Sequence, residues 1–285
     1  MVYPGIPKHT RIGGTDLFMQ LSELNPTRPW PLPQAPWIMS QQWRDITFIH
    51  YAVDSNMLHP FIPKGLELDT YHDQAWISIV VLQVHHLRLR FMPPIPGMMD
   101  FNQINIRTYV RSSEGKPGVY FLRIGATSRL AVFGASTFMH MPFVHADLRI
   151  DPMHPDKSQL SHPPIQRIDC SLSDHTKLRL RATPVSSPYP AVTNPLTKWL
   201  TERYCQYSDS LHPVPLQAKG AVSSELLITD IQHSPWSVQT ANVSVEENSL
   251  LQPFGIALPS SPHLATYTMK LQAYIWWQRP VKPIR

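Results

Sequence analysis

The stretch FNQINIRTYV, residues 101–110, decides how the rest of this chain is interpreted. From residue 103 on, its odd positions carry Gln, Asn, Arg and Tyr, while its even positions carry Ile, Ile, Thr and Val. Because a β-strand sends successive side chains to opposite faces, this pattern predicts a strand with one polar and one mostly apolar face. If the polar face points outward, the strand is an ordinary half-exposed one. If the polar face points inward, it lines a cavity, and the cavity carries the function.

Runs of alternating or β-branched residues on both sides of this stretch predict about ten strands. The Gly/Pro turn after it favours an antiparallel hairpin with the strand that follows. Further strands are expected at 45–53, 66 onward, 75–91, 166–172, 177–183, 224–233, 239–247 and 269–278. Helices are expected in three places: a short one within 15–24, one from the cap Ser128 to Pro142, and one from the cap Asn194 and Pro195 through residue 207.

This order of elements, without repeats or an evident linker, predicts one mainly β domain, a barrel or sandwich with helices at its rim. We expect a poorly packed N-terminal arm over residues 1–27 and a single domain over 28–285. Within the latter, RPWPLPQAPW combines four prolines with two tryptophans and predicts an extended, rigid segment with large apolar anchors.

Composition excludes several classes of protein. The chain has 285 residues, of which 42% are hydrophobic and only 16% charged, so it can bury a large core. Its net charge of +5 is scattered rather than gathered in a basic stripe, so no nucleic-acid partner is expected. No apolar run approaches the ~18 residues that span a membrane. Cys170 and Cys205 form no CxxC pair, and no secretory segment is evident, which predicts reduced thiols in a cytoplasmic protein.

Fourteen histidines raise the question of a metal site. HExxH is absent, and the adjacent His85 and His86 would point to opposite faces of a strand, so no metal and no cofactor are expected. GxSxG, Walker and GxGxxG motifs are also absent. Cys205, beside aromatic residues on the predicted helix, is interpreted as a core residue rather than a nucleophile.

The candidate ligand contacts share the polar face of the opening strand: Gln103, Asn105, Arg107 and Tyr109. An arginine in so apolar a chain must be solvated, ion-paired or bound to an anion. One interpretation pairs Arg107 with Glu202 or Asp45, and another gives it a ligand. Both stay open, since buried arginines serve both purposes.

A second cluster of charge lies in LTERYCQYS, residues 200–208. Glu202 and Arg203 are neighbours on the predicted helix, so Glu202 could reach inward as a further ligand contact while Arg203 contacts a strand. The alternative is that Trp199 and Tyr204 dock the helix and the charges only close the seam. His233 and Trp236, in QHSPWSVQ, are expected to serve packing.

Several segments together resemble the YqjF-like family of bacterial proteins, a domain of unknown function. They are RPWPLPQAPW, WRDITFIHYAVD, FIPKGLELDTYHDQAWISIV, NQINIRTYVR, the helix ending in FMHMPF, LTERYCQY, HSPWSVQ and PHLATYTMKLQAYIW, which extend from about residue 28 to 280. The family in turn resembles acetoacetate decarboxylase in fold. The resemblance implies an antiparallel β-barrel with two or three outer helices and a closed, largely apolar pocket, into which the polar face of the opening strand would point.

The same resemblance implies a different chemistry from that of the decarboxylase. Decarboxylation there needs a Schiff-base lysine with a second lysine beside it. None of the nine lysines of this chain is adjacent to another, and MPFVHADL, the segment that should carry the pair, has none. The family pattern also keeps a glutamate ahead of Asn-x-Arg where this chain has Gln103, which exchanges no proton near neutral pH. The chain is therefore not expected to be a Schiff-base acetoacetate decarboxylase.

Three functions remain open. The first is binding of a small molecule, such as a carboxylate or another oxygen-rich ligand, without turnover. The second is an enzyme in which His50 or Tyr109 is the acid/base and Arg107 orients an anionic substrate. The third is an interaction protein that uses the Pro/Trp-rich segment 29–37 as a contact surface. Self-association is expected only by analogy with the decarboxylases.

Overall fold

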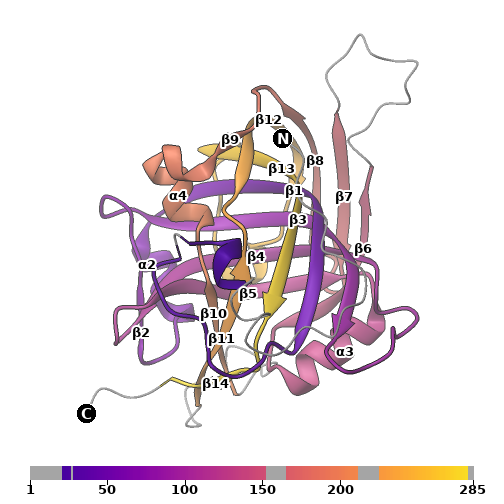
Figure 1. Cartoon of the computed structure of the whole chain (residues 1–285). Helices are drawn as coiled ribbons and strands as arrows, with labels where there is room; N and C mark the ends of the chain where they lie inside the picture. Colours follow the sequence, from indigo (N-terminus) through magenta and orange to yellow (C-terminus); the bar gives the residue numbers. More distant parts are fainter. Residues whose placement is uncertain (1–20, 27, 152–164, 211–224, 282–285) are drawn as a thin grey trace.

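The computed structural model describes residues 21–26, 28–151, 165–210 and 225–281, and most of them lie in strands (Figure 1). The strands are β1 Met39–Val53, β2 Leu66–Leu68, β3 Ala75–Leu89, β4 Phe101–Ser112, β5 Pro117–Ala126, β6 Phe143–Ile150, β7 Gln166–Leu172, β8 Lys177–Pro184, β9 Tyr189–Pro190, β10 Cys205–Asp209, β11 Leu226–His233, β12 Ser237–Asn248, β13 Leu264–Ile275 and β14 Arg279–Pro280. The helices are α2 Ser55–Leu58, α3 Arg129–Phe138 and α4 Pro195–Thr201, with short 3₁₀ turns at His59–Phe61, Ala191–Thr193 and Gln252–Phe254. The chain is thus mainly β with a few helices, as the sequence predicts.

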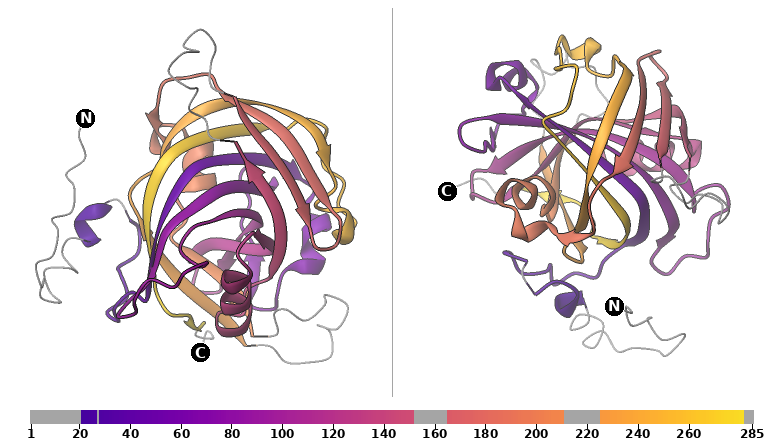
Figure 2. Two further views of the ribbon diagram at one scale, coloured as in Figure 1. Left: turned by 90° about the vertical axis from the view of Figure 1, so that its right-hand side faces the viewer. Right: turned by 90° about the horizontal axis from the view of Figure 1, so that it is seen from above.

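The strands form one strongly curled sheet. Five of them, in the order β13-β1-β3-β4-β5, make a continuous wall. From β5 the pairing continues along two routes, one through β10 and β11 and one through β6, β7, β8 and β12, and both routes return to β13. Figure 2 shows the strands following one another around a ring. The pairing is antiparallel except where β5 meets β10 and β6 in short parallel ladders.

Both faces of the shared wall are covered. Alternate residues, among them Ile49, Ile79 and Ile104, join side chains of β6, β7 and β8 in one apolar cluster. The residues between them, among them Phe48, Val80 and Leu82, face β11 and the bend after it, where Ile231 and Trp236 lie. The opening strand therefore has no solvent face along most of its length. Its isoleucines fill an apolar core, and Gln103, Asn105 and Arg107 face the second interior.

A bulge in β1 brings residues of both parities to this second interior. The pairing of β1 with β3 shifts register between Arg44 and Thr47, and Asp45 adopts a positive φ of 48°. Met39, Gln41 and Trp43 line the interior before the bulge, and Ile46 and Phe48 line it afterwards. The extra residue of a bulge reverses the side-chain alternation, which explains this change of parity.

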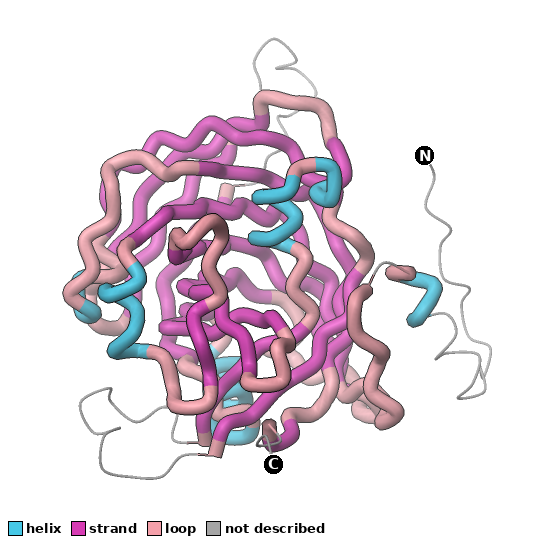
Figure 3. The backbone as a smooth tube through the Cα atoms, turned by 90° about the vertical axis from the view of Figure 1, so that its left-hand side faces the viewer, coloured by secondary structure: helices cyan, strands magenta, loops and turns pink. Residues whose placement is uncertain are grey.

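The helices lie at the edges of the sheet (Figure 3). The oxygen of Ser128 caps α3 by accepting from the N–H of Ala131, and that of Asn194 caps α4 by accepting from the N–H of Thr197, as the sequence predicts. The prediction that the helix capped by Asn194 continues to residue 207 is wrong. It ends at Thr201, and the chain enters β10, where it pairs with β5 and β11. Cys205 is therefore on a strand, although it is buried in the core as expected.

The predicted N-terminal arm is described only in part. Residues 21–24 are helical, and residues 1–20 lie outside the described chain. Of the residues described there, Leu21 and Asn25 are buried. Leu21 packs with Leu32 and Trp276, and Asn25 donates to the hydroxyl of Tyr204 at 2.5 Å. This contact ties the end of the arm to the strand core.

The Pro/Trp-rich segment packs against its own chain. The ring of Trp37 meets that of Tyr274 with 5.5 Å between centroids, and Trp276 donates to the carbonyl of Ala35 at 2.6 Å. Among the described residues, no helix is long and apolar enough to cross a membrane.

Candidate functional site

The second interior contains a pocket of about 270 Å³. The wall strands β1, β3, β4 and β5 line it together with β10, β11 and α3, and apolar side chains predominate. Gln103, Asn105 and Arg107 all line the pocket, so the polar face of FNQINIRTYV lies where the resemblance implies. The volume lies just below the ~300–1,000 Å³ in which small-molecule sites usually occur, so it suits a small ligand.

Arg107 brings to the pocket a positive charge that no carboxylate of the described residues pairs. Its Nη2 donates to the carbonyl of Leu200 at 3.3 Å, and its guanidinium lies 5.7 Å from the centroid of Phe48 and 5.8 Å from that of Tyr109. Its Nε is buried without a hydrogen-bond partner in the described chain. Neither carboxylate proposed from the sequence reaches it, because Asp45 accepts from Tyr267 at 2.6 Å and Glu202 is engaged elsewhere. A half-buried charge with a buried, unbonded N–H favours a bound anion.

Arg203 brings a second positive charge that the sequence analysis assigned to a strand contact. Its side chain is 4% exposed, its Nη1 donates to Asp69 at 2.5 Å, and its Nε donates to the carbonyl of Trp199 at 2.7 Å. The guanidinium lies 5.0 Å from the centroid of Tyr109, the ring that Arg107 also approaches. Burial lowers the pKa of Arg203, Asp69 raises it, and the charge of Arg107 lowers it again. Asp69 is shared with Arg111, at 2.5 Å, so it does not neutralise the whole cluster.

Glu202 does not reach the pocket lining. One of its oxygens accepts from the backbone N–H of Trp236 at 2.9 Å, and the other accepts from the hydroxyl of Tyr204. Glu202 is the C-cap residue of α4, with ψ at 68°, so Arg203 after it is no longer on a helical face. The carboxylate holds the bend before β12 in place, and Arg203 points inward instead. The sequence signal for Arg203 was the same as for Arg107, a lone guanidinium among aromatic residues.

The two acid/base candidates, His50 and Tyr109, meet through Ser78. The Nδ1 of His50 lies 2.6 Å from Ser78 Oγ, which lies 2.5 Å from the hydroxyl of Tyr109. All three side chains are fully buried, and none of them lines the pocket itself. The ring of His50 stacks on Phe48, which does line it, with 5.8 Å between centroids. Burial, with a smaller effect from Arg107, lowers the pKa of His50 to about 3, so the imidazole is neutral near pH 7.

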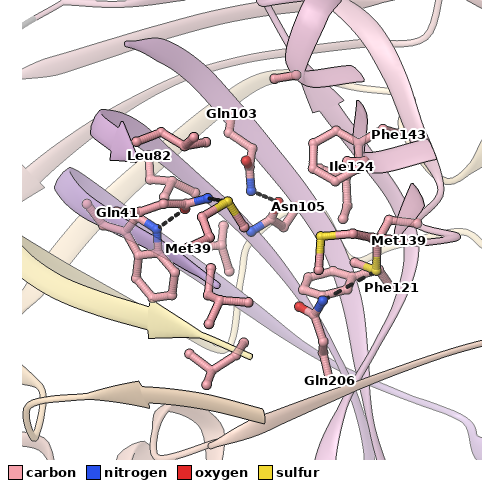
Figure 4. A pocket seen from close by; sticks show the side chains of 18 of the residues that line it. Met39, Gln41, Leu82, Gln103, Asn105, Phe121, Ile124, Met139, Phe143 and Gln206 are labelled. Atoms are coloured by element: carbon pink, nitrogen blue, oxygen red, sulfur yellow. Dashed lines mark hydrogen bonds between the residues drawn. The ribbon is translucent and has the colours of Figure 1, made fainter. Parts of the chain in front are cut away.

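The pocket amides are mostly bonded to other lining side chains (Figure 4). Gln103 donates to the amide oxygen of Asn105 at 2.7 Å, and Gln41 accepts from Trp43 at 2.7 Å. Gln206 contacts the sulfur of Met141 at 3.4 Å. These contacts pre-orient the amides and leave the guanidinium of Arg107 as the group with the most unused hydrogen-bonding capacity.

His233 and Trp236 also line the pocket, in addition to the packing role expected of them. Their rings are 5.2 Å apart, and the indole N–H of Trp236 has no partner among the described residues. No lysine is found among the described residues that line the pocket. Within the described chain, no three His, Cys, Asp or Glu side chains gather as they would around a metal ion.

A curled, mainly β chain with this pocket has the fold of acetoacetate decarboxylase-like proteins. The acetoacetate decarboxylase-like enzyme from Sphingomonas wittichii RW1 superposes with a TM-score of 0.60 at 13% identity, over 88% of this chain and 95% of that one. The enduracididine biosynthesis enzyme MppR, solved with HEPES buffer bound, gives 0.61 at 14% identity, over 88% and 89%. Acetoacetate decarboxylase from Legionella pneumophila gives 0.58 at 12% identity, over 97% and 98%. At these identities the similarity defines the fold alone.

The chain belongs to the DUF2071 family, described as an uncharacterized conserved protein, whose profile matches residues 40–272. It is 36% identical to the uncharacterized protein YqjF of Bacillus subtilis (strain 168) over 245 residues, which are 86% of this chain and 93% of that protein. The resemblance to the YqjF-like family is therefore confirmed.

Proposed function

We propose that this protein binds a small organic acid in the pocket, with Arg107 holding the carboxylate. The observation that carries the proposal is a pair of guanidiniums in the pocket lining, half-buried Arg107 and buried Arg203, of which only Arg203 has a carboxylate partner in the described chain. Arg203, fixed by Asp69, adds positive potential that favours a bound anion. The ring of strands then acts as a closed barrel around the ligand.

A comparison supports the choice of ligand class. MppR, which shares the fold, is described in complex with pyruvate, a small organic acid. In the absence of a lysine in the lining, we propose recognition through an ion pair with Arg107 rather than through a Schiff base.

Calorimetry against a panel of monocarboxylates tests this proposal, with wild type and Arg107→Gln measured side by side. We expect saturable 1:1 binding in wild type and a loss of affinity of at least tenfold in the variant, since a charge-assisted hydrogen bond is worth ~1.5–3 kcal/mol. Arg179→Gln, which removes the same charge from an exposed ion pair on β8, is the matched control and keeps wild-type affinity. Equal affinity in Arg107→Gln would exclude Arg107 as the anion contact.

The second candidate is an enzyme, favoured by the hydrogen-bonded chain from His50 through Ser78 to Tyr109 next to Arg107. This function requires Tyr109 or His50, neither of which lines the pocket, to come within reach of a substrate held by Arg107 and to exchange a proton with it, the two being linked through the hydroxyl of Ser78. Screening wild type with the acids that bind, for proton exchange or decarboxylation, tests it. Tyr109→Phe breaks the chain and should reduce any turnover by 10²-fold or more, whereas turnover unaffected by Tyr109→Phe and His50→Gln would refute it.

The remaining expectations from the sequence stay predictions. They are a cytoplasmic location, self-association, and use of residues 29–37 as a contact surface. Size-exclusion chromatography with light scattering would determine the state of association, and it would show self-association as a mass above that of one chain.

A further inference from the structure

The pocket wall between Arg107 and α3 is apolar where it is not lined by bonded amides. On β5 it is formed by Phe121 and Ile124, and beyond β5 by Met139, and these side chains face the labelled amides of β4 in Figure 4. A ligand that is polar along its whole length would leave these apolar side chains without apolar contacts. The pocket has a positive charge at one end and apolar side chains along the rest of its length. It therefore suits a ligand with an anionic group at one end and an apolar tail.

The length and volume of the pocket set the size of such a molecule. Gln103 and Arg107 are four residues apart on one extended strand, which corresponds to ~13 Å. The volume is about 270 Å³, and a water-sized group occupies ~30 Å³, so there is room for roughly nine non-hydrogen atoms. A carboxylate uses three of these atoms, which leaves about six for an apolar tail and so about seven carbons in all.

The end of the pocket remote from Arg107 reaches the surface beside α3. Phe138 and Trp277 both line the pocket and are 57% and 55% exposed. Phe133, on the same helix, is 63% exposed and lies edge-on to Phe138, with 6.4 Å between centroids. Large apolar side chains at the surface are explained if an apolar part of the ligand passes between them.

We infer that the ligand is an amphipathic monocarboxylate of about six to eight carbons, a medium-chain fatty acid or an aryl-alkanoic acid. This inference rests on the proposed function. The carboxylate contacts Arg107, and the tail lies along Phe121, Ile124 and Met139 with its end at α3. Short acids such as acetate fill only the charged end and bind far more weakly.

Gly134 on α3 offers a direct test of where the tail lies. It lines the pocket, and a Cβ built on it would meet nothing closer than Met98 Cε at 3.9 Å, so the first carbon of an added side chain meets no close contact. Gly134→Leu therefore shortens the apolar end of the pocket while it leaves Arg107 untouched. Thr137→Leu, at an exposed position of the same helix outside the lining, is the matched control.

The experiment is calorimetry with butyrate, hexanoate, octanoate and octanol on wild type, Gly134→Leu and Thr137→Leu. We expect affinity to rise about fourfold per added methylene up to octanoate. We expect Gly134→Leu to lose tenfold or more for octanoate but little for butyrate, and Thr137→Leu to match wild type.

The outcomes separate the two proposals. If butyrate binds as tightly as octanoate, or if Gly134→Leu weakens both equally, the inference about the tail is overturned and the proposed anion site stands. If octanol binds as tightly as octanoate, the carboxylate contact is wrong. If no acid of any length binds, both proposals are overturned.

Discussion

Arg107 and Arg203 carry the same charge into one pocket, but the chain treats them differently. Arg203 makes a buried ion pair with Asp69, whereas Arg107 donates only to a backbone carbonyl among the described residues. Removing a partner from a buried pair is costly because the other charge stays buried, and the cost is ~3–5 kcal/mol. A residue kept for a ligand contributes little to the folded state without that ligand.

Stability measurements on ligand-free protein should therefore distinguish the two arginines. Arg203→Gln is expected to lower the free energy of unfolding by about 3 kcal/mol, and Arg107→Gln to leave it unchanged or to raise it, since repulsion of Arg203 is relieved. Urea denaturation followed by circular dichroism measures both. An equally large loss in Arg107→Gln would mean that Arg107 is a structural residue.

The buried histidines predict sensitivity to acid. Burial and Arg107 lower the pKa of His50 to about 3, and burial also lowers that of His233, whereas an unfolded histidine titrates near 6.5. Between these values the unfolded chain binds a proton that the folded chain does not. The free energy of unfolding must then fall with pH below about 6.5, by up to ~1.4 kcal/mol per pH unit for each histidine.

His50→Gln should reduce the slope of the unfolding free energy against pH between roughly pH 4 and 6. The reduction should correspond to about one proton, or ~1.4 kcal/mol per pH unit. The measurement is the free energy of unfolding from urea titrations across that range, and the exposed His86→Gln serves as the control. A His50→Gln variant as acid-sensitive as wild type would show that His50 is not held neutral by the fold.

At the scale of elements, β5 is the strand on which the two routes of the sheet diverge. Its glycines allow close approach there. A Cβ on Gly118 would lie 2.7 Å from Cys205 Sγ and 2.9 Å from the carbonyl oxygen of Cys205, on β10. A backbone carbonyl at this distance cannot move aside as easily as the end of a flexible side chain can. The parallel pairing of β5 with β10, and hence the position of Gln206 in the pocket, depends on the missing side chain.

Gly118→Ala is accordingly expected to destabilise the protein by about 1–3 kcal/mol. Gly134→Ala on α3 meets no such contact and should stabilise by ~0.5–1 kcal/mol, because alanine is the better helix former. Thermal unfolding of the two variants next to wild type gives both values. A Gly118→Ala variant that melts with wild type would mean that β10 can move away from β5 without loss.

Local patterns predicted the elements that do not depend on distant partners. The alternation in 101–110, the caps Ser128 and Asn194 and the Gly/Pro turn after β4 are local signals, and the structure has each of them where expected. The helix predicted to residue 207 was wrong because β5 and β11 supply pairing partners that no local propensity reveals. The same error exchanged the expected directions of Glu202 and Arg203, because helical spacing was applied to residues beyond the end of the helix. Arg203, not Glu202, points into the pocket.

At the scale of the whole molecule, the wall β13-β1-β3-β4-β5 belongs to two closed routes of pairing at once. One face of the wall forms the apolar core, and the other lines the pocket. This explains why FNQINIRTYV could be recognised as two-faced from the sequence alone, while the position of Tyr109 could not. Tyr109 shares the polar parity, but its hydroxyl is bonded to Ser78 beneath the pocket rather than exposed within it. The presence of a polar inward face was predictable from the sequence. Which of its residues reach the pocket depends on the bulge in β1 and on how the strands close into a ring, and neither is visible in the local pattern.

A shared wall also predicts that both interiors unfold together. Loss of one route removes partners from strands that the other requires, so calorimetry should give a single transition with equal calorimetric and van't Hoff enthalpies. Two resolved transitions would show that the core and the pocket are separate cooperative units.

The most direct test of the central claim is a crystal structure with ω-bromo-octanoate, whose bromine is located by anomalous scattering. We expect the carboxylate to lie within hydrogen-bond distance of the Arg107 guanidinium and the bromine to lie beside α3. A carboxylate bound away from Arg107, or a chain lying with its bromine at Arg107 and its carboxylate at α3, would contradict it.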